Sequence, residues 1–143
     1  MQPRLTFGGQ DVVSSPLSVT PVGSAELKIC VIEDDPLMLS HLEGMLTTAG
    51  HDVVTALDVD TGLTRAETQG AEAAVVDILM PERDGLNFIM EIRRKLPDIR
   101  IVAISGGGRL GAGSLLKMAA GLGADATLVK PFSSSDLETA LAG

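Results

Sequence analysis

Four short apolar stretches recur along the chain, and polar residues seldom interrupt them. They cover residues 27–32, 73–76, 101–104 and 126–129. Apolar stretches of this length, separated by helix-length segments, are typical of strands that are buried on both faces of a parallel sheet. A weaker stretch at 51–56 also has the character of a strand. The pattern therefore predicts a sheet of five strands.

The segments between the strands carry apolar residues at the spacing of amphipathic helices. In the first segment Leu39, Leu42, Met45 and Leu46 share one face, and Gly50 follows the last turn. Helices are expected over residues 36–49, 58–69, 85–96, 113–121 and 134–142. Five strands that alternate with five helices predict an α/β fold, with a parallel sheet and right-handed crossover connections.

Residues 1–25 differ from the rest of the chain because they have no sustained period and contain three prolines. We expect a mostly flexible arm, followed by one folded domain over residues 26–143. An alternative is that residues 12–13 and 17–19 pair as an additional edge strand. The chain closes with the fifth predicted helix, so no output domain is expected after it.

The composition narrows the class of partner. Nineteen acidic and eleven basic residues give a net charge of −8, which repels nucleic-acid phosphates. The chain has no Trp or Tyr and only three Phe, so platforms for base stacking are also lacking. The basic cluster Arg93-Arg94-Lys95 closes a predicted helix, where it is expected to complement the helix dipole. We therefore expect no direct binding of nucleic acid.

The hydropathy and the few Cys and His residues indicate in which compartment the chain is expected and whether it could bind zinc. No apolar run approaches the ~18 residues of a membrane span, and no charged-then-apolar leader opens the chain. The single Cys30 falls within the first strand, which fits a reducing cytoplasm without a disulfide framework. With one Cys, His41 and His51 offer no zinc-ligand spacing, and both are expected to be solvated or capping residues.

Polar side chains come immediately after four of the predicted strands. Glu33-Asp34-Asp35 follows the first strand, and Asp77, Ser105 and Lys130 follow the third, fourth and fifth. Since chemistry gathers at the carboxyl ends of strands in an open parallel sheet, these residues predict one site. Two carboxylates ~5 Å apart repel by roughly 3 kcal/mol at an effective dielectric of ~20, so a proton or a cation must compensate.

The donor types indicate which cation would do so. Hard divalent ions take oxygen ligands, and Mg²⁺ typically combines a few carboxylates with waters and a substrate phosphate. Acids with one lysine therefore suggest a Mg²⁺-dependent phosphoryl site. Taken alone, Asp34 or Asp35 could instead cap the first helix, and this interpretation is favoured for Asp35.

Together these motifs resemble those of bacterial two-component response-regulator receiver domains, over about residues 27–142. The resemblance implies a flavodoxin-like, doubly wound sheet of five parallel strands in the order 2-1-3-4-5, with helices on both faces. The residues that carry it are Glu33-Asp34-Asp35-Pro36, Asp77-Ile78-Leu79-Met80-Pro81 with Asp84-Gly85, Ile104-Ser105-Gly106 and Lys130-Pro131-Phe132.

By resemblance, Asp77 is the phospho-acceptor. Asp34 would bind Mg²⁺ directly and Glu33 through water, while the backbone carbonyl of Leu79 would complete the ligands from the protein. Lys130 would pair with the phosphate, and the Ser105 hydroxyl would turn toward it. Each of these residues is of the type that its role requires: a carboxylate can attack a phosphoryl group to give an acyl phosphate, and Mg²⁺ and a lysine can neutralise the charge of the transfer.

The implied function is a stand-alone phosphorylation switch in a two-component system or phosphorelay. The donor would be a sensor histidine kinase or a phosphotransfer protein, and a separate downstream protein would detect the change. Such a chain is not an enzyme, because it promotes only its own phosphoryl transfer and dephosphorylation. A weak homodimer is compatible with these partners.

The sequence departs from the family at Thr127, where many receivers carry an aromatic ring, so the signal is expected to leave through residues 105–122. The resemblance also implies that Leu79 and Gly107 stand at the positions that tune loss of the phosphate; neither side chain can hold an attacking water, so a longer-lived phosphate is expected. One alternative is a scaffold receiver that signals by binding without phosphate. A second is a small-molecule phosphatase, but the Asp-x-Asp pair of such enzymes is missing at Asp77. The glycine run after Ser105 lacks the Lys-Ser/Thr of a nucleotide-binding loop.

Overall fold

Helices and strands alternate strictly along the chain in the computed structural model, which describes residues 26–78, 85–106 and 112–143. The elements are β1 (Lys28–Ile32), α1 (Pro36–Thr48), β2 (Asp52–Ala56), α2 (Val59–Thr68), β3 (Ala73–Asp77), α3 (Gly85–Lys95), β4 (Arg100–Ser105), α4 (Ala112–Leu122), β5 (Ala126–Val129) and α5 (Ser134–Ala142). These bounds agree closely with the ranges expected from the apolar pattern. The predicted arm and its alternative edge strand lie outside the described residues.

The five strands form one sheet in the order β2-β1-β3-β4-β5, and every neighbouring pair is parallel. This confirms the predicted α/β class and strand order. Because all strands run the same way, their carboxyl ends lie at one edge of the sheet. The connections depart to opposite sides of β1, and such a switch point is where open α/β sheets bind ligands.

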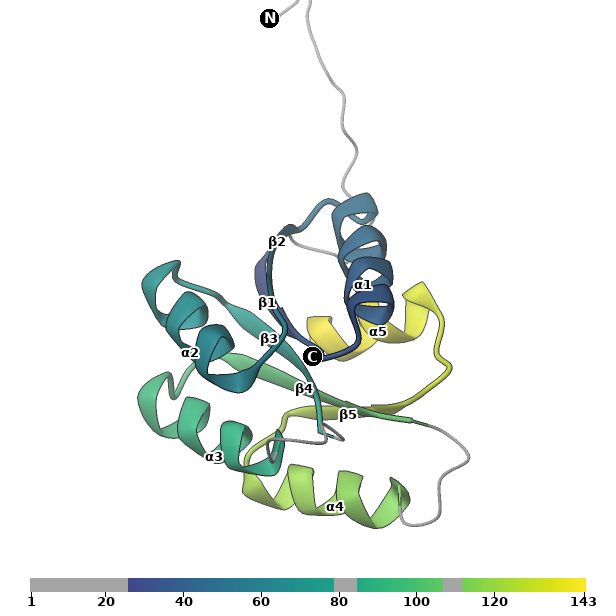
Figure 1. The fold of residues 1–143 in the computed structure, drawn as a ribbon. Coiled ribbons are helices and arrows are strands. Elements are labelled where there is room, and N and C mark those ends of the chain that lie inside the picture. The colour runs from purple at the N-terminus through teal and green to yellow at the C-terminus, as the bar shows by residue number, and fades with distance from the viewer. Residues whose placement is uncertain (1–25, 79–84, 107–111) are drawn as a thin grey trace, which may run out of the picture.

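Helices cover both faces of the sheet, which explains the uninterrupted apolar character of the strands (Figure 1). Successive residues of a strand point to opposite faces. Thus Ile29 and Val31 of β1 pack on the side of α1 and α5, whereas Cys30 and Ile32 pack on the side of α2, α3 and α4. The buried Cys30 thiol has its pKa raised to about 11 by burial, so it is an inert core residue.

Short-range capping fixes where the first and last helices begin. Asp35 is the N-cap of α1, and its side chain accepts a hydrogen bond of 3.1 Å from the Leu37 N–H. Pro36 occupies the first helical position, where a missing N–H costs nothing. Ser133 and Asp136 form a reciprocal capping box at α5. The interpretation of Asp35 as a cap is confirmed, and it separates Asp35 from the acids that stay available to a ligand.

The expectation for the histidines holds for His41, which is exposed, and is wrong for His51. His51 is buried with 6% of its surface exposed. Its Nδ1 accepts a hydrogen bond of 3.0 Å from the Leu27 N–H, and its Nε2 lies 2.9 Å from a Glu138 carboxylate oxygen. His51 therefore ties α5 to the beginning of β1, as a buried structural residue.

Gly62 lies where α2 packs closely against Ile32 of β1. A Cβ at this position would clash with the Cδ1 and Cγ1 atoms of the fully buried Ile32. We expect Gly62→Ala to lower the urea midpoint of unfolding, because overpacking costs about 1–3 kcal/mol. That cost exceeds the gain of at most about 1 kcal/mol from helix propensity.

Gly44 supplies the matched control for this prediction. It lies in α1, and a Cβ there would meet no atom within 4 Å. Gly44→Ala should therefore raise the midpoint, by about 0.5–1 kcal/mol of stability. Equal midpoints for the two variants would contradict the close packing of α2 on β1.

Within the described part of the chain, none of the helices combines the length and the apolar character needed to cross a bilayer.

Candidate functional site

The strand registers bring the predicted site residues to one edge of the sheet. Ile32 of β1 pairs with Val76 of β3, so Glu33 and Asp77 follow as neighbours. Ser105, the last residue of β4, pairs with Val129 of β5, so Lys130 comes next to Ser105. The Lys130 N–H also donates a hydrogen bond of 2.8 Å to the Ser105 carbonyl. Residues almost 100 positions apart are thus assembled by main-chain pairing alone.

Lys130 is the centre of the ion pairs at this edge. Its Nζ lies 2.9 Å from an Asp77 carboxylate oxygen and 3.0 Å from a Glu33 carboxylate oxygen. Both carboxylates are nearly inaccessible, with 4% of Asp77 and 1% of Glu33 exposed. Glu33 also accepts a hydrogen bond of 3.2 Å from the Asp35 N–H. The two acids and the lysine are therefore held in fixed positions before any ligand binds.

Asp34 completes a cluster of acidic oxygens beside this pair. Glu33, Asp34 and Asp77 each offer one carboxylate oxygen, and these atoms all lie within 4.8 Å of one another. Three carboxylates outnumber the single ammonium of Lys130, so the ionised cluster keeps an excess of negative charge. Oxygen donors alone, at this spacing, suit a hard divalent cation such as Mg²⁺.

Burial and charge shift the proton affinities within the cluster. Burial raises the pKa of Glu33 to about 7; the Lys130 hydrogen bond opposes this rise, and the Asp77 charge adds to it. Burial by itself would lower the pKa of Lys130, but its hydrogen bonds and charge interactions with Asp77 and Glu33 outweigh burial and raise that pKa. Lys130 is therefore a permanent cation, while Glu33 retains its proton far more readily than an exposed glutamate.

Ser105 contributes a buried hydroxyl to the same edge. The residue is fully buried, and among the described residues its Oγ has no hydrogen-bond partner. A buried polar group without a partner costs about 1–3 kcal/mol. Such a group is suited to donate to an incoming acceptor oxygen, so the donor set fits a phosphoryl group as well as a cation.

Some of the predicted site lies outside the described residues. This applies to the Leu79 carbonyl, to the rest of the motif from Met80 to Asp84, and to Gly107. Thr127 is described, and it is exposed on β5. The hydrogen bond from the Asp35 N–H to the Glu33 carboxylate could not be predicted from the sequence, because a residue of any type other than proline supplies a backbone N–H.

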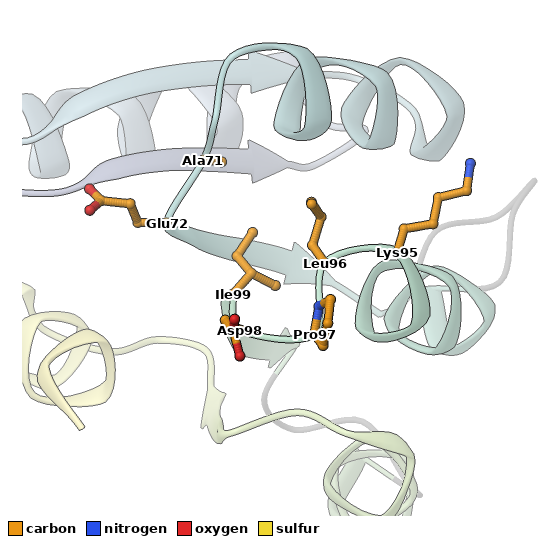
Figure 2. Close-up of a pocket in the computed structure, with 7 residues that line it drawn as sticks. All are labelled: Ala71, Glu72, Lys95, Leu96, Pro97, Asp98 and Ile99. Carbon is orange, nitrogen blue, oxygen red and sulfur yellow. The ribbon is translucent and has the colours of Figure 1, made fainter.

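A separate cavity of about 420 Å³ opens at the opposite edge of the sheet, where β3 and β4 begin. Figure 2 shows its lining, with Lys95 pointing away from Glu72 and Asp98. The described residues that line it include no buried polar atom lacking a partner. The acidic edge, and not this cavity, therefore carries the candidate chemistry.

Comparison with known proteins gives consistent results for structure and sequence. A receiver-domain protein of a response regulator from Clostridium thermocellum superposes with a TM-score of 0.73 at 27% identity, covering 80% of this chain and 90% of that one. The probable transcriptional regulator ycf27 of Cyanophora paradoxa is 34% identical over 113 residues, which are 78% of this chain and 45% of that protein.

The transcriptional regulatory protein PrrA of Mycobacterium tuberculosis is 33% identical over 117 residues, covering 80% of this chain and 48% of PrrA. The chain thus spans about half the length of the curated relatives that it matches. The family model of the response regulator receiver domain matches residues 29–142, which is nearly the whole described fold. The chain therefore belongs to the family of response-regulator receiver domains.

Proposed function

We propose that this chain is a phosphorylation-dependent switch in two-component signalling and that Asp77 accepts the phosphoryl group. One observation carries the proposal: the nearly buried Asp77 carboxylate is held by Lys130 and lies beside Glu33 and Asp34 at the switch point of the sheet. Membership of the receiver family supports the same reading.

Phosphoryl transfer to Asp77 requires mainly positioning and charge neutralisation from the other residues of the site. An Asp77 carboxylate oxygen forms a bond to phosphorus, and the bond from phosphorus to the imidazole nitrogen of a phosphohistidine donor breaks. The electron pair and a proton then stay with the imidazole. Lys130 neutralises charge on the phosphoryl oxygens and orients the nucleophile. Asp77, Asp34 and Glu33 would hold Mg²⁺, which supplies further charge neutralisation when bound.

After transfer, the new phosphoryl oxygens are acceptors for groups that are already nearby. The Ser105 hydroxyl gains the partner that it lacks among the described residues, and Lys130 keeps its place through the main-chain bond to Ser105. Charge-assisted hydrogen bonds of this kind are strong enough to bias two conformations that differ by a few kcal/mol. The phosphoryl state would thereby change the backbone after β4.

The proposed partners follow from this chemistry. The donor would be a sensor histidine kinase or a phosphotransfer protein, and the phosphorylated form would be recognised by a downstream protein or domain. The matched relatives are described as transcriptional regulators. In the proposed function the chain acts only on its own phosphoryl group and is not an enzyme toward other substrates.

A scaffold that signals without phosphate remains the second candidate, and Thr127 favours it. Its small exposed side chain stands where many receivers carry a ring that reports on phosphorylation. The buried Glu33 and Asp77 carboxylates, both paired with Lys130, favour the phosphorylated switch instead, since binding without phosphate would not require two buried acids side by side.

Incubation with acetyl phosphate and MgCl₂ distinguishes the two candidates. We expect the intact mass to rise by one phosphoryl group, and we expect EDTA to prevent the rise. A matched sample with phosphate in place of acetyl phosphate controls for bound anion. An unchanged mass under conditions that label another receiver domain would favour the scaffold.

A further inference from the structure

The Arg93 side chain forms hydrogen bonds with two separate connections of the fold, one after α3 and one after α4. It lies in the last turn of α3, where its charge was expected to complement the helix dipole. In addition, its Nη1 donates to the carbonyl oxygens of Pro97 at 2.7 Å and Ile99 at 2.8 Å. These two bonds fix the connection between α3 and β4.

The other side of the guanidinium reaches the turn between α4 and β5. Nε and Nη2 donate to the Gly123 carbonyl at 3.2 and 2.7 Å, and Nη2 lies 2.7 Å from an Asp125 carboxylate oxygen. Gly123 immediately follows α4 and has a φ of +127°, which favours glycine. A Cβ at Gly123 would lie 3.3 Å from the Arg93 side chain, so backbone and guanidinium are in close contact.

Asp125 extends this connection to the sheet. The carboxylate oxygen that faces Arg93 also accepts a hydrogen bond of 2.8 Å from the Ile101 N–H. The Asp125 N–H in turn donates to the Ile101 carbonyl at 2.7 Å. The end of α4 is therefore held to α3 by a charged side chain and to β4 by two further hydrogen bonds. Bonds to charged groups are stronger than neutral ones.

The two ends of α4 thus have different constraints. Along the chain its amino end comes after Ser105, a residue of the proposed phosphoryl site, whereas its carboxyl end is held by Arg93 and Asp125. The helix has 11 residues, so the two ends lie about 16 Å apart at 1.5 Å per residue. A displacement that begins at Ser105 would meet a fixed point at Gly123.

We propose that Arg93 anchors the carboxyl end of α4, so that phosphorylation swings the amino end of the helix about Gly123 and does not shift the helix as a whole. This inference rests on the proposed function, because the displacement starts from the phosphoryl group at Asp77. It confines the surface that changes to the amino-terminal part of α4. Arg93 is a positioning residue here and touches no reacting atom.

Hydrogen exchange of the full chain, with and without acetyl phosphate and Mg²⁺, tests the anchor. Intact mass is measured on each sample, so that the phosphorylated fraction is known. In the wild type, exchange should change over residues 112–118 and stay constant over 119–125. In Arg93→Gln the change should extend through 119–125, by about tenfold in rate for the loss of one charge-assisted interaction.

Two further variants keep the test decisive. Arg94→Gln, at the exposed neighbouring position, should behave as the wild type. Arg93→Lys retains the charge but has fewer donors and no planar fork, so it should resemble Arg93→Gln; it also serves if Arg93→Gln does not fold. A wild-type change that reaches residue 125, or a change in both Arg93 variants that stops at 118, would overturn the anchor. An unlabelled Asp77 would instead overturn the proposed function together with the inference that depends on it.

Discussion

Asp77→Asn is expected to leave the protein folded and unable to take up a phosphoryl group from acetyl phosphate. Asparagine has nearly the same volume as aspartate, and its amide oxygen can still accept the hydrogen bond from Lys130. An amide is not a nucleophile toward phosphorus, so labelling should be lost entirely and not merely slowed. Removing one of three clustered acids also relieves repulsion, so the unfolding temperature should not fall.

Asp35→Asn is the matched control for this variant. Asp35 lies at the same edge of the sheet, but its side chain caps α1, and asparagine caps a helix equally well. This variant should be phosphorylated as the wild type is. If Asp77→Asn gains the same mass at the same rate, a different residue is the acceptor.

Asp34→Ala is expected to weaken Mg²⁺ binding strongly while leaving the ion pair of Lys130 in place. The substitution removes one of the three clustered carboxylates, and the remaining two, Glu33 and Asp77, are already engaged with Lys130. Loss of a residue that merely supports a metal ligand costs about 10–100-fold in affinity, so loss of a direct ligand should cost at least as much. Isothermal titration with MgCl₂ measures the difference.

Asp35→Ala separates the metal ligand from the helix cap. It should lower the free energy of unfolding by about 1 kcal/mol through loss of the N-cap. Its affinity for Mg²⁺ should equal that of the wild type. The reverse result, with weak binding by Asp35→Ala and normal binding by Asp34→Ala, would show that the acidic run is assigned one residue out of place.

The fold was predictable because its strands are buried on both faces. Stretches such as 73–76 carry an apolar residue at every position, and all residues of β3 are buried. Once the strands are placed, parallel pairing alone brings Glu33, Asp77, Ser105 and Lys130 to one edge. The site was therefore inferred from topology, without knowledge of any side-chain conformation.

Contacts between a helix and a turn were not predictable in this way. His51 meets Glu138 across 87 residues, and Arg93 meets Gly123 across 30. Both depend on the rotation and axial position of a helix relative to a turn, which hydrophobic periodicity leaves open. A histidine that follows a glycine and a basic helix end have the same pattern whether their side chains are solvated or buried.

The Lys130 ammonium is already shared between the Glu33 and Asp77 carboxylates. An incoming cation consequently has to compete with the Lys130 ammonium for these carboxylate oxygens, because their negative charge is already partly neutralised. Sodium or potassium would bring no more charge than the lysine does, yet each would have to shed water to approach the oxygens. A divalent ion brings twice the charge and prefers oxygen ligands, so it can bind alongside the lysine. Selection of divalent over monovalent ions would then be a property of the resting ion pair, established before any phosphoryl donor arrives.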